Sequence, residues 1–415
     1  MSTVPRWAQQ LMDRHPGAKM SSPDGAVPSW LVEETRRTPL WYIIREAEEV
    51  RSAHPFLVFD EIDKEPAQWQ EILDTLDDDV ERVAEALSAR DVHHVVFTGC
   101  GSAFFTAMHG ASTFSHYTSM RADAVEAYEL AQYFPDLDPR RSVVVAHSGT
   151  GGSVETLAAV RAARERGLFT LALTNTDASP LLDECDEAVV YLTRQGCGPC
   201  ISVVSTRLVV QTMLARKLAA PETDVGRLDR SLRALPAAGR WFLDEMASRV
   251  EDFAERTKAV ESVFLVGSGP NYFSAREGTL KIEEQTGTVG KAYRTGDFHH
   301  DALSLLSPDR LVVAIAAEGA ANARVADVLR AARAAGTPTL AVEYGAASGL
   351  AGLADEAWRL EGEIEEYVAP VLLTLPFQLL GYFMGVVRGR NPDTLATDNE
   401  ANVRAWLTSF PLGTH

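Results

Sequence analysis

The sequence predicts an α/β protein with two tandem copies of one three-layer αβα domain, each a parallel sheet flanked by helices. Two observations support this prediction. Three segments of the first half recur in the second half, and each half alternates short apolar runs with longer helical patterns. The length of 415 residues suits two domains of roughly 150 residues each, together with extensions.

The repeated segments keep their order and lie 168 or 169 residues apart. Agreement of this kind is improbable between unrelated stretches, so we infer that the chain is duplicated. The pairs are VVFTGCGS (95–102) with VFLVGSGP (263–270), SVVVAHSG (142–149) with RLVVAIAA (310–317), and RAARERGLFTLAL (161–173) with RAARAAGTPTLAV (330–342).

The first copy opens with an apolar run at 95–98, which predicts a buried strand that ends in Gly99-Cys100-Gly101. A helical stretch follows from Ala103, and the apolar run 142–146 predicts the next strand. The remaining elements expected in this copy are an amphipathic helix at 154–166 and strands at 169–174 and 188–192.

The second copy repeats this alternation, with strands expected at 263–266, 311–314, 339–343 and 356–360. Strands separated by helices imply right-handed βαβ units, in which the strands are parallel and helices cover both faces of the sheet. The expected divisions of the chain are an N-terminal extension (1–55), a first domain (56–220), a helical linker (221–255), a second domain (256–390) and a C-terminal tail (391–415).

Composition excludes several classes of protein. A formal net charge of −19 argues against nucleic acid and against an anionic membrane surface as partners. No run of 18 apolar residues appears, and residues 1–28 lack the apolar core of a signal peptide, so neither a membrane span nor secretion is expected. Four cysteines without framework spacing fit a reducing cytoplasm.

The sharpest local signal is the stretch from His147 to Ser153, HSGTGGS, which follows a predicted strand and opens a predicted helix. Glycine lets backbone N–H groups turn toward one point, and a helix N-terminus favours an anion there, so a phosphate site is one interpretation. An ordinary turn with Ser153 as the N-cap is the other. The second copy has AAEGA at 316–320, which lacks hydroxyls and carries an acid, so only the first copy is expected to bind an anion.

A second candidate is the predicted helix REGTLKIEEQTG, which begins near Arg276. Glu277, Lys281 and Glu284 share one face of it, which fits either an active site or a solvated row of ion pairs. The following stretch contains His299 and His300, which could donate a proton, bind a metal or be plain polar loop residues. No third ligand stands at a suitable spacing, so a metal site is not expected.

Cys197-Gly198-Pro199-Cys200 has the sequence of a thioredoxin active site. A redox role would require the thioredoxin fold, in which this motif lies near the start of a small domain. Here the motif comes late in a duplicated α/β unit, so we expect no dithiol chemistry.

Taken together, these residues resemble the tandem SIS (sugar isomerase) domain family, whose domains have a flavodoxin-like fold. Within it the similarity is to the isomerase half of glucosamine-6-phosphate synthases and to fructosamine-6-phosphate deglycases. The resemblance covers roughly residues 60–390. Its motifs are Glu61-Ile62, Glu65-Pro66 and Trp69; Gly99 to Ser102; Ser148-Gly149; Pro199 and Ser205-Thr206-Arg207; Glu277 to Glu284; Gly296 and His300; and Tyr367 to Leu380.

The resemblance implies roles for individual residues. Glu284 would be the base that moves a proton between C1 and C2 of a phosphorylated sugar, with Lys281 and Glu277 positioning it. His300 would open the ring or protonate a leaving amine, and it would enter from the partner subunit of an obligate homodimer. No metal or organic cofactor is implied. The residues implied to hold phosphate are Gly101, Ser102, His147, Ser148, Gly149, Thr150 and Ser153, and Val203 and Ser205 would line the sugar.

This sequence also departs from the family pattern. No glutaminase domain precedes the repeats, and Ser2 follows Met1, so we do not expect a complete glutamine-dependent synthase. The family's tail lysine has no clear match, Ala103, Ala146 and His147 replace frequent hydroxyl or amide residues, and the phosphate loop is two residues longer.

The function expected is therefore that of a stand-alone enzyme on an amino-sugar or glycosylamine phosphate, in which proton transfer is coupled to C–N cleavage, as in a deglycase or deaminase. Plain aldose–ketose isomerisation is an alternative. A non-catalytic phosphosugar sensor is a third, disfavoured by the negative charge, by the lack of a helix-turn-helix segment and by the presence of both Glu284 and His300.

Overall fold

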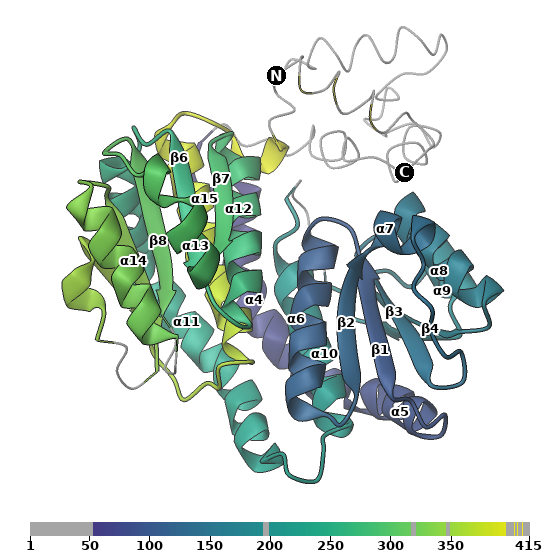
Figure 1. The fold of residues 1–415 in the computed structure, drawn as a ribbon. Coiled ribbons are helices and arrows are strands. Elements are labelled where there is room, and N and C mark those ends of the chain that lie inside the picture. The colour runs from purple at the N-terminus through teal and green to yellow at the C-terminus, as the bar shows by residue number, and fades with distance from the viewer. Residues whose placement is uncertain are drawn as a thin grey trace, which may run out of the picture.

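Two parallel five-stranded sheets, each flanked by helices, lie side by side in the protein (Figure 1). This computed structural model describes residues 53–193, 199–316, 321–345 and 349–395, with positions 402, 405 and 409. The two sheets have equivalent strand orders, β2-β1-β3-β4-β5 and, written from the opposite edge, β7-β6-β8-β9-β10. The predicted fold class, two tandem αβα units, is confirmed.

The first sheet consists of β1 (His94–Gly99), β2 (Arg121–Glu126), β3 (Ser142–Ser148), β4 (Phe169–Thr174) and β5 (Glu187–Val190). All of its strand pairs are parallel, and His94 of β1 stands opposite Arg121 on one side and Ser142 on the other. Its helices are α5 (Asp77–Ser88), α6 (Ser102–Tyr117), α7 (Ala127–Gln132), α8 (Val154–Glu165), α9 (Pro180–Glu184) and α10 (Ser202–Lys217).

The second sheet repeats this plan with β6 (Ser262–Gly267), β7 (Val289–Arg294), β8 (Arg310–Ala316), β9 (Thr339–Tyr344) and β10 (Glu356–Leu360). Its helices are α12 (Asn271–Thr286), α13 (Thr295–Asp301), α14 (Asn322–Ala334) and α15 (Ala369–Val387). Short 3₁₀ turns follow at η1 (Leu303–Leu305), η2 (Ala351–Leu353) and η3 (Pro392–Thr394).

Each sheet has one strand that the sequence analysis missed, β2 in the first and β7 in the second. Both lie at the edge of their sheet, and neither forms a continuous apolar run, since they read RADAVE and VGKAYR. An edge strand pairs on one side only and carries polar residues readily. The apolar-run criterion therefore found only the strands toward the middle and far edge of each sheet.

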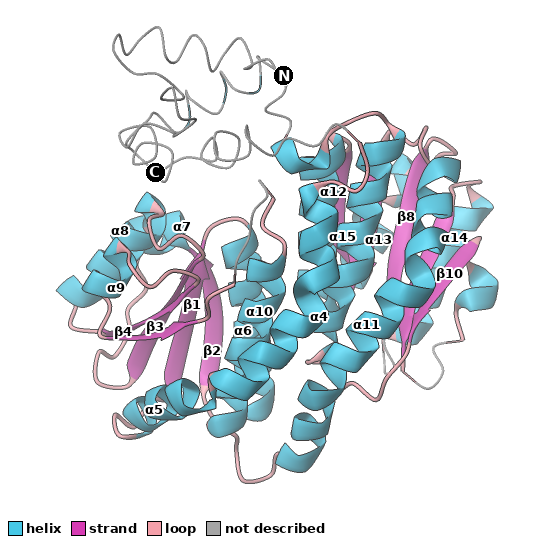
Figure 2. Cartoon of the chain, turned by 180° about the vertical axis from the view of Figure 1, so that it is seen from behind, coloured by secondary structure: helices cyan, strands magenta, loops and turns pink. Residues whose placement is uncertain are grey.

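The two copies share one hydrophobic core. Its largest apolar cluster contains Val145 of β3 and Val313 of β8, together with residues of the helices between the sheets. These helices include α4 (Leu57–Thr75) and α11 (Val225–Arg256), which lie between the two sheets in Figure 2. Residues 221–255, the expected helical linker, contain most of α11, which buries an apolar face from Leu228 to Ala254 in this core.

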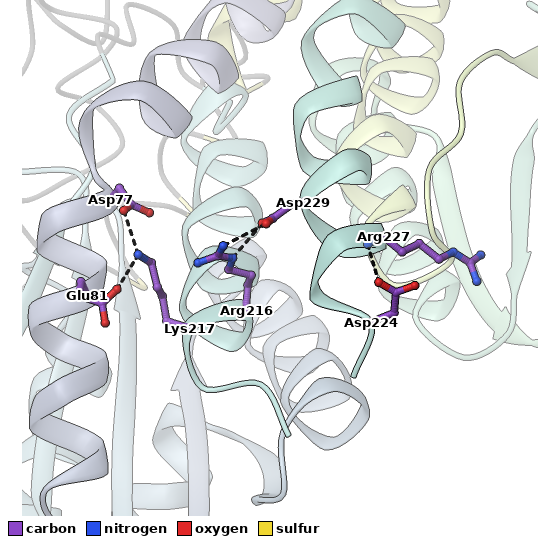
Figure 3. Close-up of polar contacts among 7 residues, drawn as sticks. All are labelled: Asp77, Glu81, Arg216, Lys217, Asp224, Arg227 and Asp229. Atoms are coloured by element: carbon purple, nitrogen blue, oxygen red, sulfur yellow. Dashed lines mark hydrogen bonds and ion pairs between the residues drawn. The ribbon is translucent and has the colours of Figure 1, made fainter. Parts of the chain in front are cut away.

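Charged side chains tie the end of α10 to its neighbours (Figure 3). Lys217 Nζ lies 2.8 Å from Asp77 Oδ2 and 2.6 Å from Glu81 Oε2, both on α5. Arg216 donates two hydrogen bonds to Asp229 of α11, at 2.8 and 2.9 Å. These contacts fix α10 against helices on both sides.

Glycine allows α15 and α12 to approach closely. A Cβ atom at Gly381 would lie 2.9 Å from the carbonyl oxygen of Lys281, and one at Gly385 would lie 2.7 Å from that of Gln285. Real side chains cannot approach backbone at such distances, so the two helices touch through their backbones. This contact sets the position of Lys281.

Helix α15 is also long and apolar enough to cross a membrane by length and composition, the one such helix among the described residues. Thr374 and Gln378 interrupt its apolar run, so the sequence contains no unbroken apolar stretch of 18 residues here. In the fold, 89% of the segment is buried, and it packs against α12 and α11 as a core helix does.

Glu65 is a fully buried carboxyl group on α4. It lies near Ser205, Thr374 and Gln378, and burial raises its pKa from 4.5 to about 8. The described residues show no cation paired with it, so the folded protein holds the side chain in its neutral form at neutral pH.

We expect Glu65→Gln to flatten the dependence of stability on pH. Below pH 4.5 the carboxyl is protonated in both states; from there to about pH 8 only the unfolded chain loses the proton, so stability falls as pH rises. At pH 7 the variant should gain about 3 kcal/mol over the wild type, relative to their difference at pH 4. Urea unfolding across this range measures the effect.

The exposed Glu71 on the same helix provides the control, and Glu71→Gln should keep the wild-type pH dependence. An unchanged slope in Glu65→Gln would contradict the buried neutral carboxyl.

Candidate functional site

The candidate site lies at the carboxyl-terminal edge of the first sheet. The chain leaves β1 for β2 on one side, whereas β3 pairs with β1 on the other. A crevice for ligands opens where the strand order reverses in this way. The connections after β1 (Gly99 to Ser102) and after β3 (Ser148 to Ser153) therefore begin side by side.

The connection 148–153, here named the serine loop, is a tight turn held by its own hydroxyls. Ser148 Oγ accepts the N–H of Gly151 at 3.0 Å, and Thr150 Oγ1 accepts that of Gly152 at 3.2 Å. Gly151 has φ of +65°, which glycine adopts without strain. Ser153 stands at the N-cap of α8, but its hydroxyl donates to Glu155 Oε2 at 3.3 Å instead of capping the helix.

His147 lies on the opposite face of the sheet from the side chain of Ser148. Successive residues of a strand point to alternate faces, so His147 shares the face of Val145, toward α6 and α10. Its ring is fully buried, with Nδ1 3.0 Å from Thr106 Oγ1. Burial, and next the charge of Arg207, hold the pKa of His147 well below its usual range. The structure therefore places the His147 side chain beside Thr106, on the other face of the sheet from the Ser148 hydroxyl.

The two residues expected to line the sugar separate in the same way. Val203 borders the serine loop, with its Cγ1 3.1 Å from where a Cβ of Gly149 would stand. Ser205 is buried and accepts a hydrogen bond from Trp69 Nε1 of α4 at 2.8 Å, so its hydroxyl faces the interior. One helical turn contains both residues, but only Val203 faces the crevice.

Ser102 links the two copies of the domain. Gly101, with φ of +53°, turns the chain out of β1, and Ser102 begins α6. The Ser102 hydroxyl donates to Glu277 Oε1 of α12 at 3.0 Å. A residue expected to bind phosphate thus holds a carboxylate of the second copy.

Glu277, Lys281 and Glu284, here named the charged cluster, are brought together on α12. Lys281 Nζ lies 2.6 Å from Glu284 Oε2 and 3.3 Å from Glu277 Oε1. The side chain of Lys281 is 0% exposed and that of Glu277 is 3% exposed, whereas Glu284 keeps 22%. The alternative of a solvated row of ion pairs is therefore wrong.

The electrostatics of the cluster follow from burial. Burial alone would lower the pKa of Lys281, but the carboxylates of Glu284 and then Glu277 outweigh it and raise the pKa, so the ammonium stays charged. Burial raises the pKa of Glu277, against the opposing effect of Lys281. Of the three groups, the Glu284 carboxylate alone reaches the surface appreciably, so it is the one open to a bound ligand.

Cys200 lies close enough to this site for the charges of Lys281, Glu284 and Arg207 to affect the pKa of its thiol. Burial raises its pKa, which keeps the thiol protonated. Cys197, the other cysteine of the motif, lies outside the described residues.

His300 is exposed on α13, which is a short helix and not the loop expected. Phe298 of α13 packs in the apolar cluster that contains Phe264 of β6, whereas Ile282 of α12 packs in the cluster that contains Leu265. Neighbouring residues of β6 point to opposite faces of the sheet, so α13 and α12 cover opposite faces (Figure 1). The structure therefore does not bring His300 to the charged cluster of its own chain.

The SIS domain family matches this chain twice, over residues 89–220 and 258–386. The two ranges contain the serine loop and the charged cluster. Glutamine–fructose-6-phosphate aminotransferase (isomerizing) of Methanothermobacter thermautotrophicus is 29% identical over 348 residues, which are 83% of this chain and 56% of the relative. The protein of the same name from Pyrococcus horikoshii is 28% identical over 318 residues, or 75% and 52%. The chain spans about half the length of these curated relatives.

Solved structures share the fold at lower sequence identity. The C-terminal domain of glucosamine-fructose-6-phosphate aminotransferase from Francisella tularensis has a TM-score of 0.74 at 19% identity, covering 82% of this chain and 98% of that one. Glucosamine-6-phosphate deaminase from Thermotoga maritima has a TM-score of 0.67 at 22% identity with the same coverage. Tagatose-6-phosphate ketose/aldose isomerase from Escherichia coli has 0.68 at 19%, covering 84% and 97%.

We expect Lys281→Met to lower the free energy of unfolding by about 3–5 kcal/mol, because it leaves Glu277 buried without its cation. Lys258→Met is the matched control, since Lys258 is 53% exposed and pairs with Glu255 at the surface. The control should lose less than about 1 kcal/mol. Urea unfolding compares the two variants, and equal small losses would show that the charged cluster contributes no more than a surface pair.

Proposed function

The chain belongs to the SIS domain family, and we propose that it is an enzyme that transfers a proton between C1 and C2 of a phosphorylated amino sugar or glycosylamine. The observation that carries this proposal is the partly exposed Glu284 carboxylate, fixed 2.6 Å from a fully buried ammonium. A base held in one orientation at the edge of a buried region suits general acid–base chemistry.

The serine loop would hold the phosphate of the substrate. It joins the end of β3 to the start of α8, where backbone N–H groups and the positive end of a helix favour an anion. Its hydroxyls now bind its own N–H groups, and an entering phosphate would take over some of those bonds. Gly101 and Ser102 would border the other side of the crevice, and Val203 would contact the sugar.

Glu284 would remove the proton from one carbon, which gives an enediol or enolamine intermediate. It would then return the proton to the neighbouring carbon. Lys281 orients this carboxylate through their hydrogen bond. Glu277 holds Lys281 from the other side and is itself held by Ser102. Ser102 of the first copy and the three charged groups of α12 would thus act on one reaction centre.

His300 would act in the site of a second subunit. It is exposed, and its helix covers the face of the sheet opposite to α12. A homodimer in which α13 of one subunit borders the crevice of the other would place an acid near the substrate oxygen or amine. Hydrolysis of the C–N bond, in which a water molecule supplies the new oxygen and the amine leaves with a proton, would make the protein a deglycase or deaminase; the Thermotoga maritima neighbour is named a glucosamine-6-phosphate deaminase.

The reaction can be tested on glucosamine-6-phosphate, fructosamine-6-phosphates and fructose-6-phosphate, with products followed by mass spectrometry. Release of ammonia or an amine would support C–N cleavage, and interconversion without release would indicate a plain isomerase. Binding without turnover of any of them would contradict an enzyme of this class and indicate a sensor.

We expect Glu284→Gln to lower kcat by about 10²–10⁴-fold, because a positioned base contributes on that order. Binding of the phosphosugar should persist. Glu283→Gln is the control: Glu283 is the preceding residue, half-buried, and accepts the N–H of Gly290 at 3.1 Å. Steady-state kinetics should show full activity in the control, and activity retained by Glu284→Gln would rule out its assignment as the base.

We expect mixtures of Glu284→Gln and His300→Ala proteins to regain activity after subunit exchange. Each variant alone lacks one group in both sites, whereas a mixed dimer has one intact site, so random exchange should give about a quarter of the wild-type rate. His299→Ala should remain active alone. Absence of recovery in mixed dimers verified by native mass spectrometry would show that His300 does not act across subunits.

A further inference from the structure

Arg207 of α10 is a buried cation that the proposed reaction does not use. Its side chain is part of a residue only 2% exposed. Its Nε donates to the hydroxyl of Tyr191 at 2.6 Å, and its Nη1 donates to Thr106 Oγ1 at 3.1 Å. No carboxylate forms an ion pair with it within the described ranges, in contrast to Lys281, which has two. An internal guanidinium held only by neutral groups is unfavourable by itself.

The guanidinium lies directly beneath the serine loop. Its Nη2 is 3.5 Å from where a Cβ of Gly149 would stand, and no hydrogen bond of Nη2 to the described part of the chain is seen. A side chain at position 149 would also meet Val203 Cγ1 at 3.1 Å. Glycine at 149 therefore lets the backbone of the loop rest on the cation, and the remaining N–H donors of Arg207 face the loop.

The groups around Arg207 leave its charge uncompensated. Burial holds the pKa of His147 far below its usual range and raises that of Cys200, so both are neutral at neutral pH. Burial also raises the pKa of Tyr191, which keeps the phenol protonated. The neighbouring carboxylates of the charged cluster are already engaged by Lys281. The positive field of Arg207 thus acts on whatever binds at the serine loop.

The second copy has the opposite arrangement. Helix α15, the counterpart of α10, contains no charged residue. Gly269 lies in the connection after β6. The carboxylate oxygen Oε1 of Glu366, just before α15, is 4.0 Å from where a Cβ of Gly269 would stand. The copy with the hydroxyl-rich loop has a buried cation, and the other copy has a carboxylate beside the end of β6, the counterpart of β1. The cation accompanies the loop that suits an anion.

We infer that Arg207 supplies the positive charge of the phosphate subsite and makes this site select phosphorylated over unphosphorylated sugars. Arg207 is a positioning residue: its guanidinium lies against the backbone of the serine loop at Gly149 and attracts the phosphate through that loop. The inference rests on the proposed function, because it assumes that the serine loop binds the phosphate. It also explains how a chain with a net charge of −19 can hold a dianion.

The test compares Arg207→Met and Arg207→Lys with the wild-type protein by calorimetric titration at fixed ionic strength. The ligands are glucosamine-6-phosphate, glucosamine and inorganic phosphate. Arg207→Met should lose about 30-fold or more in affinity for both phosphorylated ligands and little for glucosamine, whereas Arg207→Lys should keep most of the preference because it keeps the charge. Arg216→Met is the control on the same helix. Arg216 stands in the last turn of α10 and pairs with Asp229, as Figure 3 shows, so this variant should bind as the wild type does.

The pH profile separates a charge effect from a loss of structure. The second proton of a sugar phosphate leaves near pH 6, so wild-type affinity for glucosamine-6-phosphate should rise between pH 5 and 7, and Arg207→Met should show a flatter rise. Equal affinity of Arg207→Met and wild type for the phosphorylated ligands would overturn the inference. An equal loss for glucosamine would do the same. If Arg207→Met does not fold, a phosphate preference lost in a folded Arg207→Lys would also contradict it, whereas absence of phosphosugar binding by the wild type would refute the proposed function itself.

Discussion

A single buried ammonium organises the candidate site. Lys281 lies between two carboxylates inside the protein, and it is stable there only because both are within ion-pair distance. One of them, Glu277, is held in turn by Ser102 from the other copy of the domain. The close contact of Gly381 with the Lys281 backbone fixes how far inside the protein the Lys281 side chain begins. The orientation of Glu284, and with it any proton transfer, depends on this chain of contacts.

The duplicated fold carries unequal chemistry. In each copy the strand order reverses between two adjacent strands, β1 and β3 in the first and β6 and β8 in the second. A parallel sheet forms a crevice at the carboxyl ends of such strands. In the first copy, hydroxyls and Arg207 surround that place; in the second, the carboxylate of Glu366 lies beside it. The second copy instead contributes α12, whose charged face turns toward the first. The topology thus provides two equivalent places, and the side chains decide which one can hold an anion.

The repeat and the alternation of strands and helices predicted the fold because both depend on local pattern. The site was less accessible to that reasoning. Spacing placed the charged cluster on one helix face, but its burial comes from α6 and α15, which are distant in the sequence. His147 shows a signal that was present and not used: in a strand it must share the face of Val145, away from Ser148. The burial of Arg207 has no such local signature, since its partners Tyr191 and Thr106 come from other elements.

The shared core has a consequence for how the chain can be divided. A duplicated protein invites the view that each half is a module that could be moved or expressed by itself. Here α4, α11 and α15 fill the space between the sheets and contribute to one apolar cluster with both of them. A cut between the copies would expose this apolar surface on each fragment. One domain was duplicated, but the two copies fold together as one unit.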